Sequence, residues 1–517
     1  MSVPSQARPA LHVDGLSVRI ADRTLVDGVS FDVAPGECVA IVGESGSGKS
    51  LTVRALLGLL PSGAVLSARG LAIGGVDVRG LSEREWRGLR GARIALVSQD
   101  ALVSLDPLRR IGAEIAEPLD IHDMLPRAQR PARVQRLLAD VAMPDPPRRA
   151  RQRPHELSGG LRQRALIASA LAADPAILIA DEPTTALDAT VQAHVLALLR
   201  RIADDGTAVV FVSHDMAAVQ RMADRILVLR DGRVVEEGAA SAVLEHPQAP
   251  YTRELVQAAS ATPRPAVPED RETPLADVRG LGRSFDRPVL RDVSFRWGRG
   301  RTLGVVGESG SGKTTLARIL IGVERADAGT VTWTAGPRPR IQLVHQNPLG
   351  AFDPRWTIGR SLREALAAGG VSRTERAGRA TALLREVGLD PALAARRPLA
   401  LSGGQRQRAA IARALAADPE VLVLDEPVSA LDATVRTRIL ALLDRLQRDR
   451  GLSMLLISHD LAVIAQAADD VLVMQAGSIV EQGPASRVLA DPQHPFTREL
   501  VAAFDSSAVS PSGDQEA

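Results

Sequence analysis

Short hydrophobic runs recur along the chain, and each leads into a longer stretch with the periodicity of a helix. In the first half these runs read "CVAIVG", "AILIAD" and "AVVFVSHD", and in the second half "TLGVVG", "VLVLDE" and "MLLISHD". Runs that are apolar at nearly every position are typical of strands buried on both faces. Their alternation with helical stretches predicts parallel sheets with crossover helices, an α/β fold. Mainly helical inserts are expected over about 108–156 and 356–400.

The whole pattern occurs twice. The segment "LAADPAILIADEPTTALDATVQAHVLALL" at 171–199 returns as "LAADPEVLVLDEPVSALDATVRTRILALL" at 415–443. A repeat of this length predicts two homologous domains in tandem, over 11–255 and 275–503. Residues 256–274 are rich in Pro, Ala and charge and are predicted to be a linker. The tail 504–517 lacks an apolar pattern and is predicted to be disordered.

Composition narrows the function classes. The 517 residues carry 63 Lys+Arg against 61 Asp+Glu, a formal net charge of +2. Few groups titrate near neutral pH, so this small surplus alone accounts for the pI of about 9.1 and does not predict nucleic-acid binding. The one cysteine, Cys38, excludes a disulfide framework and a cysteine-built metal site, and is interpreted as a small core residue in a reducing cytosol.

Membrane segments are not predicted either. No run approaches the roughly 18 apolar residues that cross a bilayer, and the N-terminal residues "MSVPSQARPA" lack the apolar run of a signal peptide. If the protein works at a membrane, other chains bring it there.

Two glycine-rich loops carry the first candidate chemistry. "GESGSGKS" at 43–50 and "GESGSGKTT" at 307–315 fit GxxxxGK[ST], and each lies between an apolar strand and an amphipathic helix. The glycines allow successive backbone N–H groups to surround a phosphate, and Ser50 and Thr314 offer a hydroxyl to Mg²⁺. The predicted nucleotide-binding residues are Gly43, Glu44, Ser45, Gly46, Ser47, Gly48, Lys49, Ser50 and Leu51, then Gly307, Glu308, Ser309, Gly310, Ser311, Gly312, Lys313, Thr314 and Thr315.

The lysine content supports this assignment. Lys49 and Lys313 are the only lysines in the chain, although arginine is abundant. An ammonium on a thin flexible stem reaches the β- and γ-phosphates, whereas the wide planar guanidinium does not fit the same loop. The chain therefore keeps lysine where arginine cannot replace it.

Acidic residues end two of the apolar strands. Asp181 and Asp425 are placed to hold Mg²⁺ through water. Glu182 and Glu426 follow one residue later, and we expect them to act as general bases toward the attacking water.

Further motifs place the chain in a known family. "LSGGLRQR" at 157–164 and "LSGGQRQR" at 401–408 resemble the signature of ATP-binding cassette (ABC) ATPases. A glutamine after an apolar strand (Gln99, Gln346) and "SHD" (His214, His459) are in register with the family's motifs. The resemblance covers nearly everything but the linker and the tail, and implies that ATP and Mg²⁺ are bound. It implies two P-loop nucleotide-binding domains, each a RecA-like core with an antiparallel β subdomain and a helical signature subdomain.

The resemblance also implies how the two cassettes cooperate. Members of the family close head to tail, which places Ser402 and Gly404 opposite Lys49. By the same rule Ser158 and Gly160 lie opposite Lys313. The two glutamines would sense Mg²⁺ and link the site to a membrane partner, and the two histidines would hold the γ-phosphate.

Two departures from the family pattern distinguish the halves. The aromatic residue that usually stacks on adenine is present as Phe285 in the second half, whereas the first half offers only Ile20, which predicts weaker binding there. The first signature has Leu161 where the second has Gln405. Because the serine and both glycines remain, both sites are predicted to hydrolyse ATP.

Accessory segments indicate the subfamily. The segments after the two glutamines, "SQDALVSLDPLRRIG" and "HQNPLGAFDPRWTIG", look like those of oligopeptide, dipeptide and nickel importer ATPases. "EHPQAPYTRELV" at 245–256 and "DPQHPFTRELV" at 491–501, here called the HP elements, resemble the end of those cassettes. No cysteine follows either element, unlike in many members, and this weakens a choice among peptide, glutathione and nickel as cargo.

The resemblance therefore implies an energy-coupling ATPase subunit of a peptide-class importer. Its expected partners are two transmembrane permease subunits and, through them, an extracytoplasmic substrate-binding protein. It would be a peripheral protein at the cytoplasmic face of the cell membrane. The alternative is a soluble tandem-cassette ATPase acting on ribosomes, although such members carry a long charged helical linker. Repair and chromosome ATPases would need a coiled coil or cysteine-rich zinc modules, and the sequence has neither.

Overall fold

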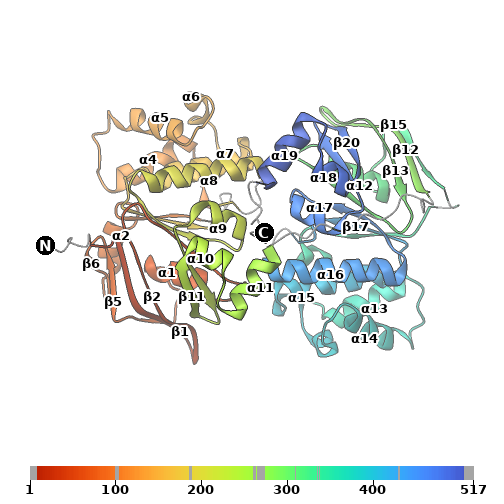
Figure 1. Ribbon diagram of the computed structural model, residues 1–517, viewed down its shortest axis with the longest axis horizontal. Coiled ribbons are helices and arrows are strands. Elements are labelled where there is room, and N and C mark those ends of the chain that lie inside the picture. The colour runs from red at the N-terminus through yellow and green to blue at the C-terminus, as the bar shows by residue number, and fades with distance from the viewer. Residues whose placement is uncertain are drawn as a thin grey trace, which may run out of the picture. The chain divides into compact units, whose positions relative to one another are not determined.

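The computed structural model describes two compact units (Figure 1). Described are residues 8–98, 104–184, 189–259, 264, 274–308, 310–334, 336, 338–428 and 431–505. Up to residue 259 they belong to the first unit, and from 264 onward to the second. Most of the predicted linker and tail lies outside the described residues, so the proposed domain boundaries stay a prediction.

A mainly parallel sheet forms the centre of the first unit. Its strand order is β11-β10-β3-β9-β8-β7, with β11 antiparallel at one edge. The strands are β3 (Cys38–Val42), β7 (Ile94–Val97), β8 (Ile177–Asp181), β9 (Ala208–Val212), β10 (Arg225–Arg230) and β11 (Arg233–Ala239). The apolar runs of the sequence thus form parallel strands, and the predicted α/β class is confirmed.

Strand β3 explains why its run is apolar at every position. Cys38, Ala40 and Val42 belong to one hydrophobic core, whereas Val39 and Ile41 belong to another. Successive side chains of a strand point to opposite faces, so a central strand between two cores needs apolar residues on both. Cys38 is fully buried, and burial raises the pKa of its thiol to about 12, as expected for a core residue.

An antiparallel sheet and a helical insert complete the first unit. The sheet has the order β2-β1-β5-β6, and β4 also pairs with β1. Its strands are β1 (Leu11–Ile20), β2 (Arg23–Val33), β4 (Ala64–Ser67), β5 (Gly70–Ile73) and β6 (Val76–Asp77). The helices are α1 (Lys49–Leu56), α2 (Glu83–Leu89), α4 (Ile111–Ile121), α5 (Arg130–Asp140), α6 (Pro146–Arg149), η1 (Pro154–Glu156), α7 (Gly159–Ala170), α8 (Ala189–Asp204), α9 (Met216–Met222), α10 (Ala240–Glu245) and α11 (Pro250–Ala259).

The second unit repeats this plan. Its sheets have the orders β16-β17-β18-β14-β19-β20 and β13-β12-β15. The strands are β12 (Pro274–Ser284), β13 (Pro288–Gly298), β14 (Thr302–Gly307), β15 (Ala328–Trp333), β16 (Ile341–Val344), β17 (Val421–Asp425), β18 (Ser453–Ile457), β19 (Asp470–Gln475) and β20 (Ser478–Pro484). The helices are α12 (Lys313–Ile321), η3 (Pro348–Ala351), α13 (Ile358–Ala368), α14 (Arg376–Glu386), η4 (Pro391–Ala395), η5 (Pro398–Ala400), α15 (Gly403–Leu415), α16 (Ala433–Arg450), α17 (Leu461–Ala467), α18 (Ala485–Ala490) and α19 (Pro495–Asp505).

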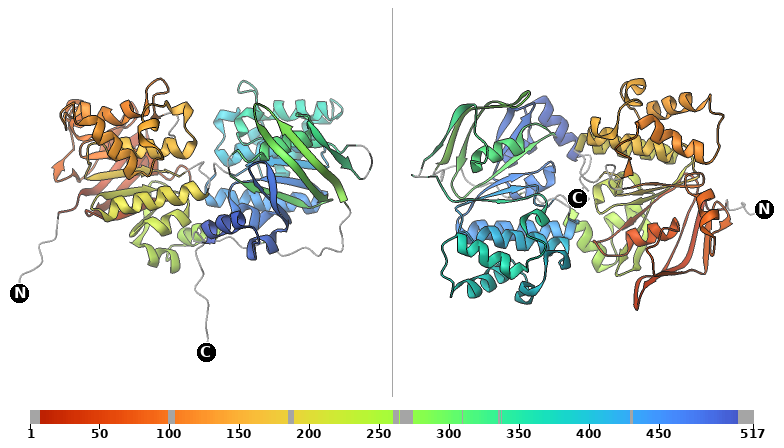
Figure 2. Two further views of the ribbon diagram at one scale, coloured as in Figure 1. Left: turned by 90° about the horizontal axis from the view of Figure 1, so that it is seen from above. Right: turned by 180° about the vertical axis from the view of Figure 1, so that it is seen from behind.

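The helical inserts lie where the sequence predicted them. In each unit they form a group of helices beside the sheets (Figure 2). Helices α4, α5 and α6 fall within 108–156, and α13 and α14 fall within 356–400. Both inserts pack onto the signature helices, α7 in the first unit and α15 in the second.

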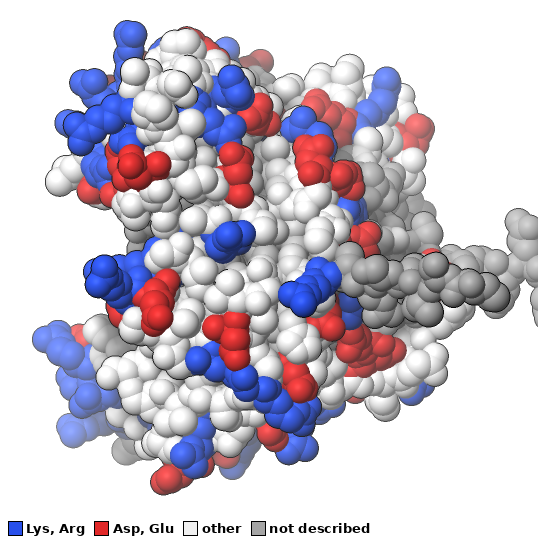
Figure 3. Space-filling view, turned by 90° about the vertical axis from the view of Figure 1, so that its left-hand side faces the viewer, with Lys and Arg blue, Asp and Glu red and all other residues white. Residues whose placement is uncertain are grey.

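The described surface carries charges of both signs. On the face of the first unit drawn in Figure 3, basic and acidic side chains are interspersed, and they form no continuous basic stripe. Among the described residues, no helix has the length and apolar character needed to cross a membrane.

Candidate functional site

Each phosphate loop begins with a glycine that no other residue could replace. Gly43 has a φ of +152°, and a Cβ there would lie 2.2 Å from the carbonyl oxygen of Leu229. Gly307 has a φ of +150°, and its Cβ would lie 2.1 Å from the carbonyl oxygen of Met474. The loop therefore passes directly against the neighbouring strand, which only a residue without a side chain allows.

The middle of each loop opens toward solvent. Gly46 and Gly310 have φ angles of +87° and +84°, and no atom lies within 4 Å of a Cβ built on either. By contrast, the hydroxyls of Ser47 and Ser311 are buried and have no hydrogen-bond partner among the described residues. Each loop thus forms an open cradle lined by backbone N–H groups, with a helix beginning directly after it.

The two lysines span their loops in the same way. Lys49 Nζ donates to the carbonyl oxygens of Gly43 at 2.6 Å and Glu44 at 2.9 Å. Lys313 Nζ makes the equivalent bonds, at 2.7 and 2.8 Å. The side chains are only 6% and 8% exposed, so each ammonium is a buried cation beside the cradle. Each loop thus holds one compact cation, and the requirement for lysine there stays a prediction.

The remaining predicted loop residues lie in the loops and in the first turns of α1 and α12. Gly48 and Gly312 are the N-caps of α1 and α12, both with left-handed backbones. The first turns of these helices contain Ser50, Leu51, Thr314 and Thr315, and the side chains of Ser50 and Thr314 are exposed. Glu44, Ser45 and Glu308 lie in the loops themselves. Ser309 lies outside the described residues.

Asp181 and Asp425 end strands β8 and β17, each next to another parallel strand. Burial is the main reason that the pKa of both carboxyls lies above its ordinary value, and the adjacent glutamate raises it further. Nearby cations, among them Lys49 in the first unit and Lys313 in the second, act in the opposite direction. These carboxyl groups are thus partly desolvated and close to the phosphate cradle, a suitable setting for a divalent cation.

The next residue in each unit has an unusual backbone. Glu182 and Glu426 both have a φ of +48°, in the left-handed region. Their N–H groups donate to the carbonyl oxygens of Val212 at 2.9 Å and Ile457 at 3.0 Å. A left-handed backbone costs a residue with a Cβ about 1–2 kcal/mol. Strands β8 and β17 end directly before these left-handed residues, a feature that sequence periodicity cannot reveal.

The two glutamates are held by predicted site residues. His214 Nδ1 lies 3.1 Å from Glu182 Oε1, and His459 Nδ1 lies 3.0 Å from Glu426 Oε1. Gln346 Nε2 donates to Glu426 Oε2 at 2.7 Å. Burial lowers the pKa of His459, but the hydrogen bond and charge of Glu426 outweigh it, so the pKa lies above its ordinary value. Gln99 lies outside the described residues.

The signature serines differ between the units. Ser402 is the N-cap of α15: its hydroxyl accepts from the Gln405 N–H at 3.3 Å, and Gln405 Oε1 accepts from the Ser402 N–H at 3.0 Å. Ser158 is the N-cap of α7 and makes no side-chain cap hydrogen bond. Leu161, which stands where the second unit has glutamine, has no side-chain oxygen to accept from the Ser158 N–H. The single sequence difference between the signatures thus removes the return bond of the capping box.

The second signature glycine packs against the following helix. A Cβ on Gly160 would lie 2.4 Å from Val191 Cγ1, and one on Gly404 would lie 2.5 Å from Val435 Cγ1. These glycines are thus required for close helix packing in addition to any contact with nucleotide. A Cβ on the first glycine of the second signature, Gly403, would approach no atom closer than 3.5 Å.

Gly404→Ala is expected to lower the free energy of unfolding by about 1–3 kcal/mol, because the new methyl group overlaps Val435. Gly403→Ala is the matched control and should cost less. Calorimetric unfolding of both variants and of Gly404→Ala, Val435→Ala measures the effect. Additive costs in that double variant would show that the two side chains do not compete for space.

The predicted adenine contacts also differ. Phe285 follows β12 and is 55% exposed, with the Arg283 guanidinium 4.7 Å from its ring centroid. Ile20 ends β1 and is half-buried. The second unit thus has an exposed aromatic ring at this position, whereas the first unit has an aliphatic side chain.

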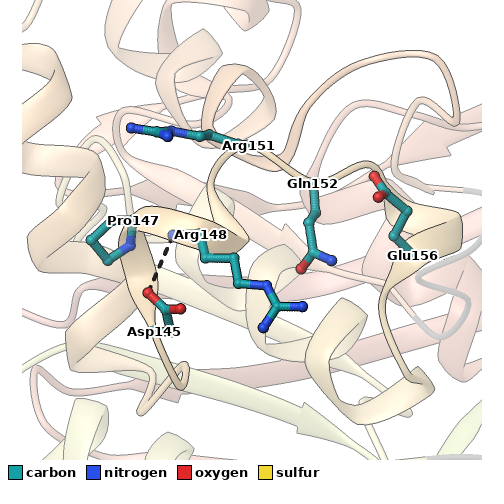
Figure 4. Close-up of a pocket in the computed structure, with 6 residues that line it drawn as sticks. All are labelled: Asp145, Pro147, Arg148, Arg151, Gln152 and Glu156. Atoms are coloured by element: carbon teal, nitrogen blue, oxygen red, sulfur yellow. Dashed lines mark hydrogen bonds between the residues drawn. The ribbon is translucent and has the colours of Figure 1, made fainter.

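One hollow lies on the helical insert of the first unit (Figure 4). It has a volume of about 590 Å³ and is lined by Asp145, Pro147, Arg148, Arg151, Gln152 and Glu156. The lining contains two arginines and two acidic residues, and it includes no residue of the phosphate loop. The hollow is therefore separate from the site described above.

A contact that the sequence analysis missed joins the first HP element to the phosphate loop. The N–H of Glu44 donates to the hydroxyl of Tyr251, 207 positions away, at 2.9 Å. The one available signal is that Tyr251 and Phe496 occupy the same place in the two HP elements, and that only one has a hydroxyl.

Two units, each with a phosphate loop, a strand ending in Asp-Glu and a helix that begins at the signature, define a tandem P-loop ATPase. The family model described as ABC transporter matches residues 26–185 and 290–429. A second model, described as oligopeptide/dipeptide transporter, C-terminal region, matches residues 235–280 and 480–510. The chain belongs to the ABC transporter family, as its motifs predicted.

Relatives of known name match over nearly the full length. The chain is 41% identical to the peptidoglycan transport ATP-binding protein YejF of Agrobacterium fabrum, over 98% of each chain. It is 39% identical to the glutathione import ATP-binding protein GsiA of Salmonella choleraesuis, over 96% of this chain and 90% of that one.

A solved structure called RNase-L Inhibitor has a TM-score of 0.64 with this chain at 21% identity, over 96% of this chain and 99% of that one. An archaeal ribosome recycling factor, aABCE1, has a TM-score of 0.64 at 22% identity, over 93% and 96%. At such identity, the likeness shows the fold alone.

Proposed function

We propose that the chain is the ATP-hydrolysing, energy-coupling subunit of an importer of the peptide class. The observation that carries the proposal is the C-terminal region of oligopeptide/dipeptide transporters, matched at the end of both cassettes. The names of the relatives add peptidoglycan transport and glutathione import to the range of cargo. The cassette contacts no cargo in this proposal, so its residues do not choose among these.

Both loops fit the triphosphate of ATP. The open cradle at Gly46 and Gly310, the buried hydroxyls of Ser47 and Ser311, and a buried ammonium together form a set of hydrogen-bond donors in each loop. Hydrogen-bond donors and a cation grouped in this way bind the oxygens of a polyanion such as a triphosphate. The bonds that each lysine makes to loop carbonyls would be exchanged for stronger bonds to phosphate oxygens.

The residues around each loop also fit Mg²⁺. Oxygen ligands are available from Ser50 and Asp181 in the first unit and from Thr314, Asp425 and Gln346 in the second, and Gln99 is proposed for the first. When bound, the ion would neutralise charge that develops on the phosphates.

Hydrolysis is assigned to the paired glutamates. Glu182 and Glu426 would accept the proton of the attacking water, and each is held by a histidine at hydrogen-bond distance. His214 and His459 can donate from Nε2 to a phosphate oxygen while Nδ1 faces the carboxylate. In the second unit, Gln346 fixes the other oxygen of Glu426.

We further propose that each nucleotide is completed by the other cassette. Ser402 and Gly404 would face the nucleotide held by Lys49, and Ser158 and Gly160 the one held by Lys313. Each signature serine begins a helix, so its end offers N–H groups and a positive dipole to the γ-phosphate. ATP would close the pair of cassettes, and hydrolysis would reopen it.

The proposed partners are two permease subunits in the membrane and, through them, an extracytoplasmic binding protein. The chain would lie at the cytoplasmic face of the membrane. Purification of the tagged chain from gently solubilised membranes is expected to recover two integral membrane proteins, with the binding protein in the same complex. Recovery with ribosomes, in place of membrane proteins, would contradict the proposal and favour the ribosomal alternative.

A further inference from the structure

The two HP elements are anchored in the same way. In the first, Glu236 of β11 accepts from the N–H groups of Gln248 at 2.8 Å and Ala249 at 2.9 Å. In the second, Glu481 of β20 accepts from two consecutive N–H groups at 2.8 and 3.0 Å. Burial raises the pKa of both carboxyls, but these bonds outweigh it and the pKa lies below its ordinary value. Each element is thus fixed to its cassette by a charged anchor.

The helix that follows each anchor directs an aromatic ring into the core. Tyr251 on α11 and Phe496 on α19 are both 5% exposed. Arg230, at the end of β10, lies with its guanidinium 4.8 Å from the centroid of the Tyr251 ring. The matching residue at the end of β19 is Gln475. The two aromatic rings are therefore equally buried. Only Tyr251 has a hydroxyl, and its ring has an arginine stacked on it where the second unit has Gln475.

The hydroxyl is what connects the HP element to the phosphate loop. It accepts from the N–H of Glu44, the second residue of the loop, at 2.9 Å. Lys49 binds the carbonyl oxygens of this same residue and of the glycine before it. Tyr251 therefore holds one end of the loop segment to which the phosphate-binding lysine is also bonded. Phenylalanine cannot make this bond to the second loop.

We propose that Tyr251 is a positioning residue of the first ATP site. Through its hydroxyl, the first HP element holds the phosphate loop in its nucleotide-binding shape, whereas Phe496 leaves the second loop without this support. The inference rests on the proposed binding of ATP at these loops. It assigns the HP element a role inside the cassette, and it adds one further difference between the two ATP sites, the hydroxyl of Tyr251.

Loss of the hydroxyl should weaken nucleotide binding more than it slows hydrolysis. Removing the acceptor leaves a part-buried N–H group unpaired, which favours other loop shapes. A smaller population of competent loops raises the apparent Kd without changing what happens once ATP is bound. For Tyr251→Phe, we expect the Kd at the first site to rise about threefold to tenfold, and kcat to change less than about twofold.

The experiment measures nucleotide binding at each loop separately, in the full-length chain. Lys313→Ala removes binding at the second loop, so titration with the fluorescent analogue MANT-ATP in Mg²⁺ then reports the first. Tyr251→Phe is expected to weaken binding in this background and to leave binding unchanged in the Lys49→Ala background, which reports the second loop. Equal weakening of both loops would mean a general structural effect and would overturn the inference.

A matched variant separates the hydroxyl from the ring. Arg230→Gln copies the second cassette and removes the stacked cation but keeps the hydroxyl, so the Kd at the first loop should stay within about twofold. A rise equal to that of Tyr251→Phe would assign the effect to ring packing and overturn the inference. If the Lys313→Ala chain binds no MANT-ATP with Tyr251 intact, ATP binding at the first loop fails and the inference with it. If it binds and Tyr251→Phe changes nothing, the inference alone fails.

Discussion

The Glu182→Gln, Glu426→Gln double variant is expected to hydrolyse ATP at least about a hundredfold more slowly than the wild-type chain. An amide has nearly the shape of the carboxylate but cannot accept the proton of the attacking water. Both glutamates have the same strained backbone, and each has a histidine partner at hydrogen-bond distance, so we expect them to have the same role. Release of inorganic phosphate under saturating ATP measures the effect.

The single variants test whether the two sites are coupled. If ATP closes both cassettes together, Glu182→Gln and Glu426→Gln should each lower turnover severely, because one failed site holds the pair closed. Independent sites would leave about half of the turnover in each single variant. Glu375→Gln, at an exposed position on the helical insert, is the control for a lost carboxylate. A single variant with no effect would identify a degenerate site.

Replacing either lysine by arginine is expected to weaken ATP binding about tenfold or more at that loop, close to the effect of alanine. Both ammonium groups are buried and already lie within 2.9 Å of loop carbonyls, so the space suits one nitrogen and not a planar fork. Nucleotide titrations of Lys49→Arg and Lys313→Arg, each beside its alanine variant, measure the loss.

The arginine variants also test why the chain retains lysine. Charge is conserved in them, so any loss comes from size and geometry. Full binding by either arginine variant would contradict the steric explanation. The lysines would then need another reason to persist among 63 basic residues.

Local patterns predicted the parts of the fold and site that depend on a few neighbouring residues. The run "CVAIVG" predicted a strand buried on both faces, and β3 divides its residues between two cores. The glycine spacing predicted the loop between β3 and α1. The capping box at the start of α15 joins Ser402 and Gln405, three positions apart, so it too depends only on neighbouring residues.

Features that depend on distant residues or on backbone strain could not be predicted from one sequence. The left-handed Glu182 lies at the end of an apolar run that indicates only a strand. The contact of Gly160 with Val191 depends on the approach of two helices, and the bond from Glu44 to Tyr251 joins residues 207 positions apart. The spacing of apolar and polar residues along the chain does not indicate these contacts. They arise from the way the strands and helices pack.

The central claim is that each cassette completes the ATP site of the other. The most direct test is a structure of the Glu182→Gln, Glu426→Gln variant with ATP and Mg²⁺ bound. We expect Ser402 at the γ-phosphate of the nucleotide held by Lys49, and Ser158 at that held by Lys313. Two bound nucleotides with Ser402 remote from the one at Lys49 would contradict the account.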